Sequence, residues 1–339
     1  IIVATNIAET SLTIPGIKYV IDAGLARLLE YNPRSQTTGL PVRPVSRSSA
    51  DQRKGRCGRV ADGICIRLYA PEDFAARPLY TTPEILRSNL AGVILRMLAL
   101  NLGSVTDFPF IDRPQPKAIR DGLETLRDLG AITRDEDAAG GEVTRLTAVG
   151  RTMAQYPLDP RVSRIILEAQ KEGCVGEIAV IAAALSIQDP RERPYDQIDR
   201  AAAAHAQFQH PESDFLAYLQ IWNRYADTLE KMQSQGKLRK FCREHFLSWR
   251  RMMEWRDIYR QILDIAQGSR PSPVRRKPPR FDIDQAVADK ISRALLAGYL
   301  SNIAQKKEKN FYTAAKSREV MLHPGSGLFN RGGPWIVAS

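Results

Sequence analysis

Residues 52–59, which read Gln-Arg-Lys-Gly-Arg-Cys-Gly-Arg, constrain the fold of this chain more than any other stretch. Positions three apart on a helix lie on one face, so a helical segment would project Arg56 and Arg59 together, with Gly55 and Gly58 as bare backbone beside them. Guanidinium groups stay charged and match phosphate oxygens in a forked geometry, which suits the pair to a triphosphate. Most arginine pairs at this spacing are solvated surface charges, and the segment alone leaves that alternative open.

A polar segment near the amino end bears on the same question. The apolar run at residues 1–4 predicts a strand that is buried on both faces. Hydroxyl and amide groups follow at once, where parallel sheets place ligands, and they are Thr5, Asn6, Thr10, Ser11 and Thr13. The alternative interpretation is a polar turn followed by a helix that Thr10 or Ser11 caps.

In this order and separation, the two segments resemble motifs V and VI of the DEAH-box (DEAH/RHA) RNA helicases of superfamily 2. The form Gln-Arg-Lys-Gly-Arg-Cys-Gly-Arg-Val is similar to the bacterial HrpA branch of that family. Further segments resemble the family too, namely 19–24, 31–34, 44–50, 146–151, 157–161, 184–191 and 323–328. The resemblance therefore covers nearly the whole chain.

The resemblance implies an enzyme that uses ATP, with roles for the residues of the arginine segment. Arg56 and Arg59 would act as arginine fingers that stabilise charge on the β- and γ-phosphates during transfer. Gly55 and Gly58 would let the backbone approach the nucleotide. Gln52 would orient the attacking water.

The segment after the first expected strand would contact both ligands, again by resemblance. Thr5 and Asn6 would hold RNA phosphates, which sets register without reading sequence. Ser11 would sense the state of the nucleotide, and Thr13 would lie near its ribose. Pro15 stands where many eukaryotic relatives carry an Asp, so any ribose contact made by that Asp is absent here.

A basic hairpin is expected between residues 24 and 47. Two extended stretches flank the turn signal Asn32-Pro33-Arg34-Ser35. The segment resembles the β-hairpin that family members press against RNA, and its arginines include the expected RNA contact Arg34. An ordinary solvated hairpin is the alternative.

Two motifs of the family do not occur in this sequence. It contains neither a G-x-x-x-x-G-K-[ST] phosphate loop nor an Asp-Glu-x-His motif. In the family these belong to the first RecA-like lobe. The sequence has no initiator Met, starts inside an expected strand and stops on the apolar run 334–339, so we expect both ends of the chain to be truncations. The missing N-terminal lobe would hold Mg²⁺ and the phosphates, and the chain alone would hydrolyse no ATP.

The composition favours a polyanionic partner. The formal net charge is +11 over 339 residues, which points to nucleic acid first. Single-stranded RNA is the partner that the resemblance implies. A DNA-directed helicase and a non-catalytic RNA-binding scaffold are the alternatives. No apolar run approaches the roughly 20 residues that span a bilayer. The four cysteines and four histidines lack metal-type spacing, so we expect no metal site and reduced thiols in a cytoplasmic protein. We also expect the protein to be a monomer.

The expected fold class is α/β followed by a mainly α part. By resemblance, residues 1–71 form the C-terminal part of a second RecA-like lobe and 72–150 a winged helix. Residues 151–268 form a helical ratchet domain, 269–289 a basic Pro-rich linker and 290–339 a truncated OB-fold.

Periodicity predicts the elements of these domains. Strands are expected at 1–4, 18–22 and 63–69, with a wing strand at 143–146. Helices are expected at 84–98, 116–129, 161–171, 174–187, 213–231, 239–267 and 290–300. In the segment 239–267, aromatic rings alternate with arginines. We favour rings that face a helical core over rings that stack on bases.

Overall fold

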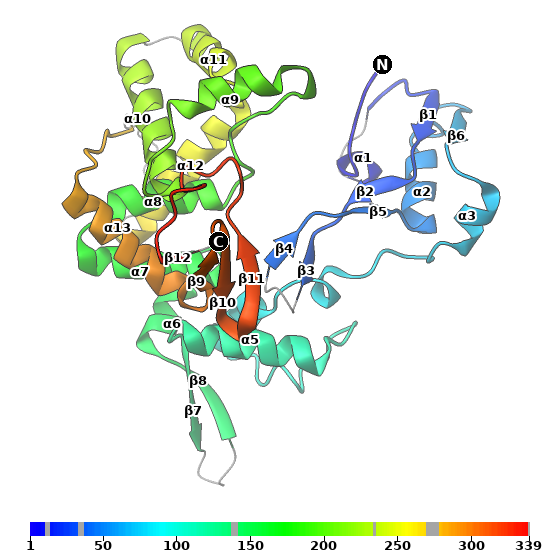
Figure 1. Cartoon of the computed structure of the whole chain (residues 1–339). Helices are drawn as coiled ribbons and strands as arrows, with labels where there is room; N and C mark the ends of the chain where they lie inside the picture. The colour runs from blue at the N-terminus through cyan, green and yellow to red at the C-terminus, as the bar shows by residue number, and fades with distance from the viewer. Residues whose placement is uncertain (11–13, 33–36, 137–141, 233–234, 269–277, 338–339) are drawn as a thin grey trace. The chain divides into compact units, whose positions relative to one another are not determined.

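The computed structural model describes residues 1–10, 14–32, 37–136, 142–232, 235–268 and 278–337 (Figure 1). The chain divides into two compact units. Unit 1 comprises Ile1–Leu90 and Ser104–Gly122, and unit 2 comprises Ala91–Gly103 and Leu123–Ser339. Each unit is described by itself.

A two-stranded parallel sheet organises unit 1. β1 (Tyr19–Asp22) pairs in parallel with β6 (Ile64–Arg67). The strands expected at 18–22 and 63–69 are therefore confirmed. The strand expected at residues 1–4 is wrong, because these residues are exposed and lie outside any helix or strand. An extended segment becomes a strand only when its backbone groups find a partner ladder, and residues 1–4 find none among the described residues.

The expected hairpin between residues 24 and 47 is present as two antiparallel pairs. β2 (Leu25–Arg27) pairs with β5 (Val42–Pro44), and β3 (Glu30–Asn32) pairs with β4 (Thr37–Gly39). Arg43 donates two hydrogen bonds to the carboxylate of Glu30, at 3.1 and 2.9 Å. The turn that carries Arg34 lies outside the described residues.

Short helices complete unit 1: α1 (Ile7–Thr10), α2 (Arg47–Lys54), α3 (Pro71–Ala76) and the 3₁₀ turn η1 (Glu84–Leu86). The single helix expected at 84–98 is wrong. It splits into η1 and α4 (Ala91–Ala99), with Ser88 and Asn89 between them. Such side chains compete for backbone groups, which disfavours a helix interior.

The winged-helix pattern follows in sequence. α5 (Pro116–Asp128) ends in a Schellman arrangement, with Gly130 at φ +67° and the Ala131 N–H donating to Leu126 O at 2.8 Å. Glycine adopts this left-handed conformation readily, which lets the helix end here. β7 (Ile132–Glu136) and β8 (Glu142–Leu146) then form an antiparallel hairpin, which α6 (Ala148–Met153) follows.

A helical bundle fills the centre of unit 2. α8 (Val175–Leu185) is its innermost helix, since residues 178–184 are all buried. Around it lie α7 (Pro160–Glu172), η2 (Tyr195–Gln197), α9 (Ile198–Ala206), α10 (Asp214–Met232), α11 (Gln235–Glu244), α12 (Trp249–Ala266) and α13 (Gln285–Gly298). Trp255 of α12 donates from Nε1 to Val180 O at 2.8 Å, which fixes α12 on α8.

The single helix expected at 239–267 is also wrong, because it breaks between α11 and α12. Phe246 takes a left-handed conformation at φ +50°, and the Leu247 N–H closes the end of α11 on Cys242 O at 2.8 Å. The expectation that aromatic rings face the core is confirmed at Trp255 and Tyr259, which are 0% and 4% exposed.

A four-stranded antiparallel sheet ends the chain. Its order is β11–β10–β9–β12, formed by β9 (Ile303–Glu308), β10 (Phe311–Ala314), β11 (Arg318–Met321) and β12 (Trp335–Val337). The 3₁₀ turns η3 (Leu300–Asn302) and η4 (Ala315–Ser317) lie at strand ends. Ala304, Tyr312, Ala314 and Ile336 form its core.

The four cysteines carry free thiols. Cys57 in unit 1 and Cys174 and Cys242 in unit 2 are buried, and burial raises the pKa of Cys174 to about 11 and that of Cys242 to about 12. The described residues hold no group of metal-ligating side chains that could bind an ion. Of the described helices, none is both long and apolar enough to cross a bilayer.

Candidate nucleotide and nucleic-acid site

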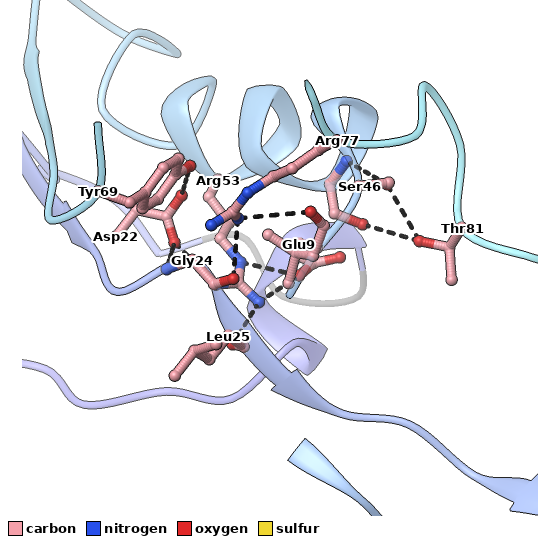
Figure 2. Close-up of polar contacts among 11 residues, drawn as sticks. Glu9, Asp22, Gly24, Leu25, Ser46, Arg53, Tyr69, Arg77 and Thr81 are labelled. Carbon is pink, nitrogen blue, oxygen red and sulfur yellow. Dashed lines mark hydrogen bonds and ion pairs between the residues drawn. The ribbon is translucent and has the colours of Figure 1, made fainter. Parts of the chain in front are cut away.

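Side chains cap the amino end of α2, the helix that leads into the arginine segment. Ser46 is the N-cap, and its Oγ accepts the Ser49 N–H at 3.2 Å. The same hydroxyl lies 3.1 Å from Thr81 Oγ1 (Figure 2). The Arg47 N–H donates to Pro78 O at 2.9 Å. These bonds use donors that a helix start leaves unpaired, and they fix where α2 begins.

The carboxyl end of α2 places the arginine pair differently from the sequence prediction. α2 ends at Lys54, so Arg56 and Arg59 lie in the turns beyond it and do not share a helix face. The chain tightens there into three-residue turns, with the Arg56 N–H donating to Arg53 O and the Cys57 N–H to Lys54 O. Arg56 is half-buried and Arg59 is exposed.

A close backbone approach holds the loop that carries these arginines. Cys57 is 3% exposed, and its thiol donates to Lys54 O at 3.0 Å. A Cβ built at Gly63 would lie 2.1 Å from Cys57 O, closer than any real contact. Only glycine fits at position 63, and this fixes how tightly the loop returns toward β6.

One guanidinium lies at the centre of the polar cluster below α2 (Figure 2). Arg53 donates from Nε to Glu9 Oε1 at 2.8 Å and from Nη1 to Asp22 Oδ1 at 2.8 Å. Its Nη2 donates to Leu25 O at 3.2 Å. Arg53 thereby joins α1, the end of β1 and the start of β2 to α2.

Asp22 is the buried anchor of this cluster, with an exposed fraction of 2%. It also accepts the Gly24 N–H and the Tyr69 hydroxyl, each at 2.8 Å. Burial acts to raise the pKa of Asp22, but the hydrogen bonds from Arg53, Gly24 and Tyr69 outweigh it and lower that pKa. Burial and the bond to Asp22 raise the pKa of Tyr69 to about 12. Asp22 is therefore ionised at neutral pH.

A second arginine, Arg77, packs over the ring of Tyr69. The Arg77 guanidinium lies 3.9 Å from the centre of the Tyr69 ring, and its Nη1 donates to Gly24 O at 2.9 Å. Gly24 adopts φ +72°, and a Cβ there would lie 2.5 Å from the Tyr69 ring. Glycine is required at position 24 on both grounds, and it allows Tyr69 and Arg77 to reach the end of β1.

Sequence models of four domain families match the chain along its length. They are the helicase conserved C-terminal domain at 1–61, the winged-helix helicase-associated (HA2) domain at 122–158, the ratchet-like HA2 domain at 159–218 and an oligonucleotide/oligosaccharide-binding (OB) fold at 291–339. The chain is 47% identical over its full length to the ATP-dependent RNA helicase HrpA of Escherichia coli (strain K12).

The chain belongs to the DEAH-box helicase family.

Two further relatives place it within that family. It is 46% identical over its full length to the ATP-dependent RNA helicase HrpA homolog of Haemophilus influenzae, and 36% identical over 99% of its length to the probable ATP-dependent RNA helicase DHX35 of Homo sapiens. The chain spans about a quarter of each bacterial relative and 45% of the human one.

Several of the expected site residues of the DEAH-box family are exposed in unit 1. Thr5 and Asn6 are exposed and directly precede α1, with their carbonyls accepting the N–H groups of Ala8 and Glu9 at 3.1 and 2.9 Å. Gln52 is exposed on α2. Ser11, Thr13 and Arg34 lie outside the described residues.

The two glycines of the DEAH-box arginine segment differ in their surroundings. Gly55 is the C-cap of α2, and a Cβ there would lie 3.4 Å from the carbonyls of Asp51 and Gln52. A Cβ at Gly58 would meet nothing within 4 Å. Open space therefore adjoins the segment at Gly58.

Sequence reasoning missed Glu9, Asp22 and Arg53. Arg53 was detectable, since it stands three residues before Arg56 in the same segment, at the spacing that separates Arg56 from Arg59. Glu9 and Asp22 gave no local signal, because they meet Arg53 only through the fold.

Proposed function

We propose that this chain is the C-terminal portion of an ATP-dependent RNA helicase and supplies one wall of its nucleotide site. The observation that carries the proposal is Arg53, which joins α1 to α2 through Glu9 at 2.8 Å. Thr5 and Asn6 directly precede α1, and Gln52, Arg56 and Arg59 lie in or just after α2. The proposed RNA contacts therefore lie beside α1 and the proposed nucleotide contacts lie in or just after α2, two helices that the Arg53–Glu9 bond joins.

ATP is the nucleotide that we propose for this wall. The open space beside Gly58 and the charges of Arg56 and Arg59 suit a polyphosphate. In our proposal the two arginines stabilise the charge on the β- and γ-phosphates and Gln52 orients water. Ser11 senses the nucleotide and Thr13 lies near the ribose. A phosphate-loop lobe outside this chain holds Mg²⁺, and ATP when bound supplies the transferable phosphoryl group.

RNA is the proposed nucleic acid, bound as a single strand. Thr5 and Asn6 would contact its phosphates and Arg34 would extend the contact along the hairpin. The proposed domains are the RecA-like part at 1–71, the winged helix at 72–150, the ratchet domain at 151–268, the linker at 269–289 and the truncated OB-fold at 290–339. We propose a cytoplasmic monomer. A non-catalytic RNA-binding scaffold and a DNA-directed helicase remain the competing candidates.

The test is ATP hydrolysis by a polypeptide that joins this chain to a lobe with a G-x-x-x-x-G-K-[ST] loop. Arg59→Ala should lower kcat by at least about 10²-fold, the lower part of what an arginine finger contributes. Arg145→Ala, at a side chain 63% exposed on the β7–β8 hairpin, is the matched control and should leave kcat unchanged. The chain by itself should hydrolyse no ATP. Unchanged turnover in Arg59→Ala would refute the proposed role.

A further inference from the structure

The two carboxylates that bind Arg53 differ in what they hold. Asp22 has a fully buried side chain and also accepts the Gly24 N–H and the Tyr69 hydroxyl, so it belongs to the framework of unit 1. Glu9 lies in α1, with a side chain that is 12% exposed. Arg53 therefore bonds to a fixed partner on one side and to a short peripheral helix on the other (Figure 2).

This contact helps to hold α1 in position. It has four residues, and none of them is buried. Isolated helices of this length do not hold together in water, so tertiary contacts must place α1. The described hydrogen bonds from a side chain to α1 include the Arg53–Glu9 bond, a charge-assisted pair in which Arg53 is 16% exposed. Bonds of this type are shorter and stronger than neutral ones.

The position of α1 also sets that of Thr5 and Asn6. The carbonyls of these residues accept the N–H groups of Ala8 and Glu9 at 3.1 and 2.9 Å. A displacement of Glu9 is therefore passed to the residues that precede the helix. On the other side, Arg53 lies one residue after Gln52 and three before Arg56.

We propose that Glu9 and Arg53 are positioning residues whose ion pair makes ATP hydrolysis respond to RNA, while hydrolysis without RNA does not depend on Glu9. This inference rests on the proposed function, and it deepens it by assigning the link between the two ligand sites. The physical warrant is a contiguous route: Thr5 and Asn6, α1, Glu9, Arg53, α2.

The test is Glu9→Ala in the joined polypeptide, which removes the ion pair and keeps a good helix former in α1. RNA-stimulated kcat should fall by about 5-fold or more, the lower end of typical coupling between sites. The kcat without RNA should stay within about 2-fold of the unaltered protein, less than that coupling effect. Asp51→Asn is the matched control, since it removes the Arg67–Asp51 ion pair of the same helix α2, with Asp51 60% exposed. It should change neither rate.

A second measurement uses this chain alone and needs no ATP hydrolysis. Hydrogen exchange at the amides of residues 8 and 9 should speed up by about 5-fold or more in Glu9→Ala, because α1 loses its ion pair with Arg53, while the amides of α2 should exchange as before.

The outcomes separate this inference from the proposed function. Equal losses of basal and RNA-stimulated kcat in Glu9→Ala, or unchanged exchange in α1, would overturn the positioning role. If Arg59→Ala left turnover intact but Glu9→Ala released α1, the proposed function would fail while the attachment of α1 stood, and the role in RNA response would fall with the proposed function.

Discussion

Asp22 is a buried, ionised carboxylate in unit 1. Its carboxylate is buried at the end of β1, where Arg53, Gly24 and Tyr69 all donate to it. A buried charge is tolerated only when such partners replace water. Asp22 therefore ties the folding of unit 1 to its own ionisation.

A pH-dependent stability should follow at this residue. The folded pKa of Asp22 lies below its ordinary value, so its contribution is present above the unfolded pKa of about 4 and is lost as pH falls through the folded pKa. At pH 7, Asp22→Asn should lower the free energy of unfolding by about 1–3 kcal/mol, the cost of unpairing a buried charged partner.

Urea denaturation at pH 7 and at about pH 3 would measure this difference. The gap between the unaltered protein and Asp22→Asn should shrink at the lower pH, whereas exposed Asp51→Asn should show little effect at either pH. A gap that stays constant would mean that Asp22 does not titrate as its contacts require.

The family could be identified from the residue types of the arginine segment, but the geometry of that segment could not be predicted. The segment 52–59 identified the family, yet the helix ends at Lys54 because the chain must turn sharply to bring Gly63 against Cys57. That approach depends on contacts six residues apart and on the sheet that follows. Periodicity carries no information about it.

Among the elements, α13 packs on α7 with little room for change at Gly298. A Cβ at Gly298 would lie 2.4 Å from Ile165 Cγ1 and 2.6 Å from Arg161 O. A side-chain atom can move aside, but a helix carbonyl cannot move without shifting its helix. Gly298 therefore sets how closely the two helices approach.

Gly298→Ala should lower the free energy of unfolding by about 1–3 kcal/mol, as overpacking in a core usually does. Gly236→Ala is the matched control in α11, because nothing lies within 4 Å of a Cβ there. Since Ala favours helix over Gly by about 1 kcal/mol, this control should be neutral or stabilising. Thermal unfolding would compare them, and an equal effect of both substitutions would argue against the packing role.

Helices with uninterrupted periodicity were predictable, and breaks within helices were not. The apolar pattern located α7, α8 and α10 almost to their ends, because burial on one side or all round leaves a clear repeat. The break between α11 and α12 depends on Phe246 at φ +50°, a conformation that aromatic residues seldom adopt. Tertiary contacts impose it against local preference.

At the scale of the whole molecule, unit 1 exposes a continuous apolar sheet face. Tyr19 pairs with Ile64 and Ile21 with Ile66 across β1 and β6, and these four side chains are 68%, 56%, 70% and 50% exposed. Alternation along a strand puts them on one side. A two-stranded sheet is marginal by itself, and large exposed apolar patches are uncommon on monomeric soluble proteins.

This face should bind a hydrophobic dye such as 1-anilinonaphthalene-8-sulfonate. The double variant Ile21→Lys, Ile66→Lys should reduce the fluorescence gain at least about 2-fold, because it removes neighbouring parts of the apolar patch. Ile111→Lys, at a side chain that is fully exposed in the same unit, is the matched control and should change it little. Equal fluorescence from all three proteins would show that the dye binds elsewhere.

The three buried thiols can serve as probes of local opening in the two units. Cys57 belongs to unit 1, whereas Cys174 and Cys242 belong to unit 2, and each is at most 3% exposed. An alkylating reagent can reach them only when the surrounding backbone opens. Mass spectrometry of the modified peptides would thus measure the rate of alkylation at each thiol, and with it the rate at which each unit opens locally.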